Sequence, residues 1–243
     1  MTEETFIEYS GATLINSEAT FLNHLEQALG KPIPRVERNE HLTFAFTSEK
    51  NHITGLGLYR QRLSQIPDSI GNLVGLETLI LEDNQISALP ETFGKLNSLE
   101  ILNLNKNQLT SLPSTFGQLK NLQELSAEKN LINLLPDSFG LLKSLKKIYL
   151  RSNKISNLPE TFAQLENLQT LDLRNNQITS LPKDFGNLVQ LRLLWLQNNK
   201  LITVPESLGN LINLQTLSLM NNPLDSPPEF VKKLQKKGCR IYF

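Results

Sequence analysis

The residues of this sequence that could do acid–base, nucleophilic or metal chemistry are few and scattered. Its three histidines, His24, His41 and His52, all precede the main repetitive part of the chain, and no cysteine or carboxylate stands at metal-ligand spacing around them. The one cysteine, Cys239, has no partner for an internal disulfide and is expected to be buried. We therefore predict no metal site and a structural or surface role for the histidines.

Motifs for phosphate binding and nucleophilic catalysis are also missing. The sequence contains no GxSxG elbow and no GxGxxG after a strand, and Gly94 and Lys95 lack the upstream glycine and downstream hydroxyl of a phosphate loop. The adjacent acids Glu82 and Asp83 are expected to point to different sides of a strand, which is unsuitable for joint acid–base work. We predict no catalytic residue, no cofactor and no enzymatic activity.

The composition is typical of a soluble globular protein, and the formal net charge is zero. Hydrophobic residues make up 39% and charged residues 20%, and 24 basic residues balance 24 acidic ones, so neither nucleic acid nor a membrane is a predicted partner. The first residues carry acids where a signal peptide needs a basic segment, and no apolar run approaches roughly 18 residues. We predict a cytoplasmic protein, with export by a non-classical route as the alternative.

A repeat of 23 residues dominates the sequence and follows the pattern LxxLxLxxNxLxxLPxxFGxLxx. In LxxLxL the second and third leucines are two residues apart, which places both on one face of a strand. One such strand cannot bury its apolar face alone, but parallel neighbours about 4.8 Å apart form a continuous sheet over a shared core. The eight units begin at Ile53, Leu76, Leu99, Leu122, Leu145, Leu168, Leu191 and Leu214.

These units resemble the repeats of leucine-rich-repeat proteins of the 23-residue bacterial type, and they are similar to the Ras-associated leucine-rich-repeat proteins of animals and plants. The resemblance covers residues 53–236. It implies an α/β fold, a leucine-rich-repeat solenoid or horseshoe with a parallel β-sheet on the concave face. By analogy alone it also suggests a small GTPase or another signalling protein as the partner.

An asparagine follows each strand from the second unit onward, and its amide can both donate and accept hydrogen bonds. Placed inside the turn, it can satisfy backbone groups that the turn leaves unpaired. We predict a structural ladder, in which the first unit departs with Gln61. The ladder consists of Asn84, Asn107, Asn130, Asn153, Asn176, Asn199 and Asn222.

A proline recurs in the return segment of every unit, and it removes an amide donor and fixes φ. A regular crossover helix is therefore not expected, and short 3₁₀ or extended segments should line the convex side. A second apolar column should hold them: Phe93, Phe116, Phe139, Phe162 and Phe185, with Ile70 and Leu208 at its ends.

Both flanks are expected to cap the solenoid. Residues 1–52 are predicted to form an N-terminal cap, with an amphipathic helix over 17–30 that starts at Ser17 and ends at Gly30, and one or two strands from HLTFAFT. The repeats are assigned to 53–236, with a short helix beginning near Pro228, and a capping strand to 237–243. The chain is expected to be a complete, monomeric molecule.

Positions 3, 5 and 7 of each unit should face the open concave surface. Large residues gather there within three consecutive units, and aromatic and arginine side chains are common in interface hot spots. Arg151 and Arg174 should lie opposite one another, so that a carboxylate of a partner would relieve their repulsion. The predicted partner-binding residues are Lys147, Tyr149, Arg151, Asp172, Arg174, Leu193, Trp195 and Gln197.

An alternative interpretation is that these are ordinary solvated residues, with Asp172 and Glu128 screening the arginines. The predicted function is a non-catalytic protein-binding scaffold that uses the preformed concave face. The alternative function is an exported or surface adhesin-like factor that binds a host protein or glycan.

Overall fold

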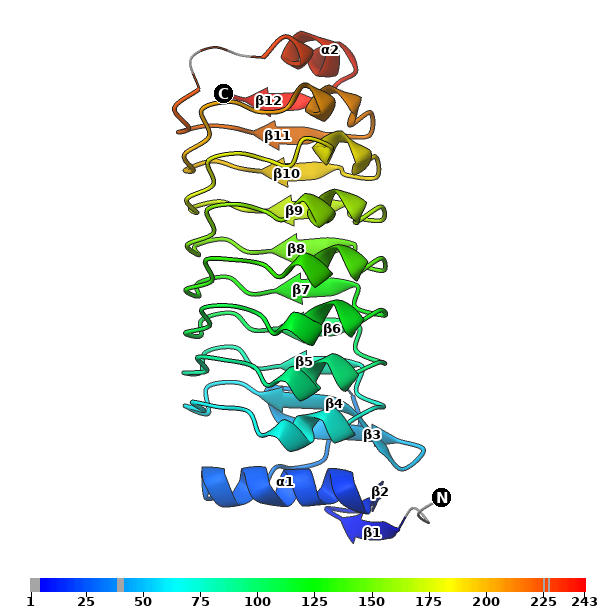
Figure 1. The fold of residues 1–243 in the computed structure, drawn as a ribbon. Coiled ribbons are helices and arrows are strands. Elements are labelled where there is room, and N and C mark those ends of the chain that lie inside the picture. Colours follow the sequence, from blue (N-terminus) through cyan, green and yellow to red (C-terminus); the bar gives the residue numbers. More distant parts are fainter. Residues whose placement is uncertain (1–4, 39–41, 225, 227) are drawn as a thin grey trace.

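Parallel strands stacked in chain order build the molecule (Figure 1). The computed structural model describes residues 5–38, 42–224, 226 and 228–243. Ten strands of these residues form one sheet, in which all neighbours are parallel except β3 and β4. The strands are β3 Phe44–Glu49, β4 His52–Leu58, β5 Thr78–Ile80, β6 Ile101–Asn103, β7 Glu124–Ser126, β8 Lys147–Tyr149, β9 Thr170–Asp172, β10 Leu193–Trp195, β11 Thr216–Ser218 and β12 Arg240–Tyr242.

The repeat sets the register of the sheet. Leu79 of β5 pairs with Leu102 of β6, and Leu102 pairs with Leu125 of β7, so equivalent positions of successive units stand side by side. These leucines are fully buried, whereas the flanking positions reach the surface. Burying each leucine stabilises the fold by roughly 1.5–3 kcal/mol, and stacking supplies this burial to every unit.

Short 3₁₀ turns return the chain along the other side, as the prolines predict. The phenylalanine column is confirmed as a stack of nearly parallel rings whose centroids lie 5.7 to 6.4 Å apart. Because neighbouring strands lie only about 4.8 Å apart, the solenoid curves with the sheet on its inner face. The turns are Asp68–Asn72, Glu91–Lys95, Ser114–Gln118, Asp137–Leu141, Glu160–Gln164, Phe185–Asn187 and Glu206–Asn210.

A glycine in most turns allows the next unit to approach closely. A Cβ on Gly117 would lie 2.0 Å from the carbonyl oxygen of Ser138, whose hydroxyl donates a 2.7 Å hydrogen bond to the carbonyl of Ser114. One joint differs, because Ala163 replaces the glycine and Asp184 replaces the hydroxyl residue that would face it. A carboxylate cannot donate this hydrogen bond, and the turn after Ala163 is shortened to Phe185–Asn187.

The N-terminal end is closed by helix α1, Asn16–Leu29, and by a hairpin of β1, Phe6–Tyr9, and β2, Ala12–Ile15 (Figure 1). The prediction that Ser17 caps the helix is wrong, since Ile15 occupies the N-cap position and no side chain caps it. A hydrophobic segment already hydrogen-bonded in the hairpin leads directly into the helix, so the entry needs no polar cap. Gly30 ends the helix at φ 66°, as expected of a left-handed C-cap.

Glu18 joins this cap to the first repeat. It is 1% exposed, and its carboxylate accepts hydrogen bonds from the backbone N–H of Ile53 at 2.7 Å and contacts Nδ1 of His52 at 2.9 Å. His52 therefore has a structural role, and His24 is exposed on α1. His41 lies outside the described residues.

The C-terminal end carries α2, Phe230–Lys236, packed beside β12. The helix places Phe230, Val231 and Leu234 in the core, and β12 adds a last parallel strand to β11. Cys239 is buried between them, and burial raises the pKa of its thiol. No helix within the described ranges is long and apolar enough to cross a membrane.

Candidate functional site

The predicted binding residues all come from the units of β8, β9 and β10. Positions 3 and 5 of each unit are the first and last residues of its strand, for example Lys147 and Tyr149 of β8. Position 7 lies two residues after the strand, at Arg151 in the same unit. The register sets Tyr149 beside Asp172 and Asp172 beside Trp195. Leu193 and Trp195 are half-buried and Lys147 is exposed, so the face is partly open to a partner.

Asp172 departs from the expectation of an open, solvated side chain, because it is 0% exposed. Both of its carboxylate oxygens accept hydrogen bonds from the guanidinium of Arg174, with Nε 2.9 Å from each, and Oδ1 also accepts the backbone N–H of Arg174 at 3.0 Å. This pair raises the pKa of the arginine. Asp172 therefore lies buried below the surface of the face, and its hydrogen-bond partner is Arg174 of the same unit.

This pairing supports the alternative interpretation for Arg174, in which Asp172 screens its charge within the chain. A partner's carboxylate at Arg174 stays a prediction. The guanidinium of Arg174 also lies 5.4 Å from the ring centroid of Trp195, as a cation–π contact. Arg174 thus holds Trp195 and Asp172 in place.

Two polar atoms on either side of Arg174 have no hydrogen-bond partner among the described residues. They are Nε of Arg151 and Oε1 of Gln197, both buried. Buried polar groups are normally satisfied, and an unsatisfied one costs about 1–3 kcal/mol. Both atoms are enclosed by the protein, and they flank the Tyr149–Trp195 segment of the face.

Glu128 lies beside these groups, and burial, followed by repulsion from Asp172, raises the pKa of its carboxyl. Arg151 and Arg174 oppose this shift without cancelling it. A carboxyl with a raised pKa in the folded state binds protons more tightly than in the unfolded chain, so stability falls as pH rises from the ordinary glutamate range through the raised value.

We expect Glu128→Gln to raise the melting temperature at pH 7, because the substitution removes a partly desolvated charge. The gain should disappear below about pH 4, where the glutamate is protonated in both states. Thermal unfolding of both proteins across this pH range measures the difference. Glu124→Gln is the control, since Glu124 is already paired with Lys147 at 2.9 Å, and a gain of the same size there would contradict the cause given.

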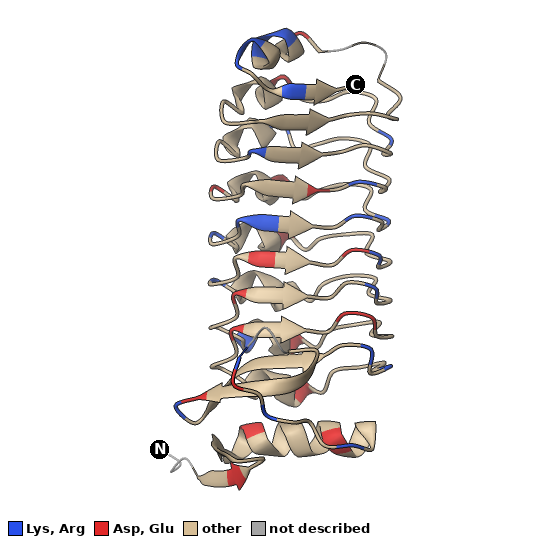
Figure 2. Cartoon of the chain, turned by 180° about the vertical axis from the view of Figure 1, so that it is seen from behind, with Lys and Arg blue, Asp and Glu red and all other residues tan. Residues whose placement is uncertain are grey.

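Charges on the sheet face are mostly paired between neighbouring units. Glu82 binds Lys106, and Asp83 binds Arg60. Both acids follow β5 and do not lie on it, which corrects their expected placement on a strand. Figure 2 shows acidic colour on β7 and β9, and basic colour on β8 and β12. The units from β8 onward are thus where cations gather on this face.

Tyr242 belongs to the same face and was not among the predicted residues. In β12 it pairs with Ser218, as Ser218 pairs with Trp195, and its side chain is 50% exposed. The signal was present in the sequence, since Ile241 continues the buried strand position and Tyr242 follows it. Burial also raises the pKa of Tyr149, with a smaller contribution from Glu124, so its hydroxyl stays protonated at neutral pH.

The asparagine ladder lies inside the turns, away from this face. Oδ1 of Asn153 accepts the backbone N–H of Ile132 at 3.0 Å, and its Nδ2 donates to the carbonyls of Ala127 and Leu150 at 2.8 and 3.0 Å. The other six predicted asparagines make the equivalent contacts: Asn84, Asn107, Asn130, Asn176, Asn199 and Asn222. Gln61 instead donates to the carbonyl of its neighbour Tyr59.

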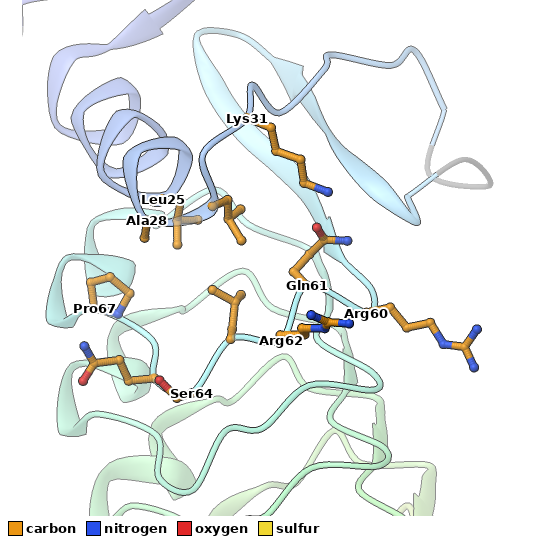
Figure 3. A pocket seen from close by; sticks show the side chains of 11 residues that line it. Leu25, Ala28, Lys31, Arg60, Gln61, Arg62, Ser64 and Pro67 are labelled. Carbon is orange, nitrogen blue, oxygen red and sulfur yellow. The ribbon is translucent and has the colours of Figure 1, made fainter.

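A cavity of about 640 Å³ lies between α1 and the first repeat. Arg62 takes a φ of 58° in the turn of this repeat, where Oδ1 of Asn84 accepts the backbone N–H groups of Gln61 and Leu63, each at 3.0 Å. Figure 3 shows Leu25 and Ala28 of the helix on one side of the cavity, and Lys31, Gln61 and Arg62 on the other.

The described ranges contain no group of three or more histidine, cysteine, aspartate or glutamate side chains that could hold a metal ion. The arrangement offers half-buried aromatic surface at Tyr149 and Trp195, with the guanidinium of Arg151 on the same strand as Tyr149. Groups of these kinds can make packing contacts and charge-assisted hydrogen bonds.

The family comparison matches the leucine-rich repeat region over residues 35–133, 70–152 and 136–237. None of the curated proteins compared with the chain matches it. A leucine-rich-repeat protein of Leptospira interrogans is 32% identical, with a TM-score of 0.60 over 84% of this chain and 62% of the other. This chain therefore spans less than two thirds of that relative.

Two further solved structures are similar. The ectodomain of the Arabidopsis thaliana receptor kinase GASSHO1/SCHENGEN3, in complex with CASPARIAN STRIP INTEGRITY FACTOR 2, is 33% identical, with a TM-score of 0.65 over 78% of this chain and 23% of the receptor chain. An internalin of Listeria monocytogenes is 22% identical, with a TM-score of 0.58 over 77% of this chain and 60% of the other. The internalin supports the fold alone.

Proposed function

This chain belongs to the leucine-rich-repeat family, and we propose that it is a non-catalytic scaffold that binds a protein through the sheet face of β8 to β12. The observation that carries the proposal is the cluster around Trp195. Half-buried aromatic side chains stand there beside Nε of Arg151 and Oε1 of Gln197, which have no partner among the described residues.

The physical support is preorganisation. Trp195 is held by Arg174, and Arg174 by the buried Asp172, so little side-chain entropy remains to be lost when a partner docks. Aromatic anchors in such fixed positions are typical of hot spots. The plant receptor ectodomain, which was solved in complex with an integrity factor, belongs to the same fold class.

The test is affinity capture from cell lysate with the wild type and with a Tyr149→Ala, Arg151→Ala, Trp195→Ala triple variant. Arg174 is left intact, because its loss would unpair the buried Asp172. We expect the triple variant to lose the captured proteins, since interface anchors each contribute more than about 1 kcal/mol.

The matched control replaces Lys154, Gln177 and Lys200 with alanine, because these exposed residues occupy the same three units but lie beyond the asparagine ladder, off the face. This control should retain the proteins that the wild type captures. Equal retention by the triple variant would show that the face is not the binding surface. Capture of glycoproteins that is lost on deglycosylation would favour the adhesin-like alternative.

A further inference from the structure

Three aromatic side chains stand on every second strand in one row of the sheet face. Tyr149, Trp195 and Tyr242 occupy the same register position in β8, β10 and β12. Between them lie the small buried side chains of Asp172, 0% exposed, and Ser218, 4% exposed. Along the row, large aromatic side chains thus alternate with small buried ones. We call it the aromatic row.

The spacing of the rings along the row follows from the sheet. Neighbouring strands are about 4.8 Å apart, so rings on alternate strands recur about every 9.6 Å. A polyproline II helix has three residues per turn and rises about 3.1 Å per residue, so it presents the same face about every 9.3 Å. An extended strand repeats a face about every 6.7 Å and would miss every second ring.

Length also matches. Tyr149 and Tyr242 are four strand spacings apart, about 19 Å. Seven residues of polyproline II helix contain six rises and span about 19 Å. Residues one, four and seven of such a segment would therefore meet Tyr149, Trp195 and Tyr242 in turn.

Hydrogen bonding favours this conformation over an α-helix. A polyproline II segment makes no internal hydrogen bonds, so its carbonyl groups need outside donors, whereas an α-helix satisfies its own backbone. The guanidinium of the half-buried Arg151, two residues after Tyr149, has several N–H donors for such carbonyl groups. Arg151 and the exposed Arg240 also favour acidic residues between the prolines.

We propose that the aromatic row binds a proline-rich, acidic segment of a partner protein in the polyproline II conformation, with prolines at every third residue. The segment runs along the solenoid axis, across the strands. The inference rests on the proposed protein-binding function and names the chemistry of the segment that the face receives.

The test titrates the blocked peptide PELPELP into the full chain and follows the fluorescence of Trp195, which is the sole tryptophan of the sequence. A control peptide, PEPLPEL, has the same composition without prolines three residues apart. We expect a saturable change with the first peptide and binding weaker by about tenfold or more with the second.

Variants locate the binding. Tyr149→Ala and Tyr242→Ala should each weaken the affinity for the peptide by about tenfold. Tyr59→Ala should leave the affinity unchanged, because Tyr59 is an aromatic residue of the same face that lies outside the row. Equal binding of both peptides, no saturable change at about 1 mM peptide, or a response only to an oligosaccharide such as cellohexaose would overturn the proposal. If peptides fail while the triple variant still loses captured proteins, the protein-binding function stands and the polyproline assignment falls.

Discussion

Asn153→Leu is expected to destabilise the protein by about 3 kcal/mol or more, because three buried backbone groups lose their partner at roughly 1–3 kcal/mol each. Asn153 is 7% exposed, and its amide connects Ile132, Ala127 and Leu150 across two units. Leucine has a similar volume but can neither donate nor accept. Urea unfolding followed by circular dichroism measures the loss.

Asn133→Leu is the matched control in a neighbouring unit. Asn133 is exposed, so its replacement should change the free energy of unfolding by no more than about 0.5 kcal/mol. A loss below about 1 kcal/mol for Asn153→Leu would mean that the turn can satisfy its backbone without the amide, and that the ladder is not a structural requirement.

Arg174→Ala is expected to cost about 2–4 kcal/mol, somewhat less than the roughly 3–5 kcal/mol seen when one partner of a fully buried pair is removed, since the side chain of Arg174 is 31% exposed. The substitution leaves the carboxylate of Asp172 buried at 0% exposure without its counter-ion.

The rescue is Asp172→Ser combined with Arg174→Ala, because Ser218 fills the equivalent buried position of β11. Chemical denaturation of the single and double variants at pH 7 gives the comparison. If the double variant is as unstable as Arg174→Ala alone, the loss comes from the contact of Arg174 with Trp195 and not from an unpaired charge.

The fold could be predicted from the sequence because the repeats carry the same types of residue at the same positions. Leucines two apart, an amide at the turn and a proline in the return segment each recur in phase, so a parallel sheet and 3₁₀ crossovers follow without any long-range information. The flanks lack such repetition. Ser10 and Gly11 form the tight turn of the β1–β2 hairpin, and this turn was missed because one short hairpin carries little signal.

The candidate site was predictable only as a set of positions. The period places Asp172 and Arg174 on the sheet face, but not whether each side chain meets solvent, a neighbour or a partner. Whether Arg174 reaches back to Asp172 or points to solvent is a detail of side-chain packing that the repeat pattern does not determine. Tyr242 lies outside the predicted set because β12 follows the last repeat, so the repeat positions do not extend to it.

The joint at Ala163 and Asp184 has a mechanical consequence for the opposite side of the molecule. Each repeat contacts only its neighbours, and this joint lacks the hydroxyl tie that fastens Ser138 to Ser114. It lies directly behind the boundary between Tyr149 and Asp172. The units on either side of that boundary are therefore joined through the β8–β9 pairing and the shared core, without the hydroxyl hydrogen bond that is present at the joints before and after it.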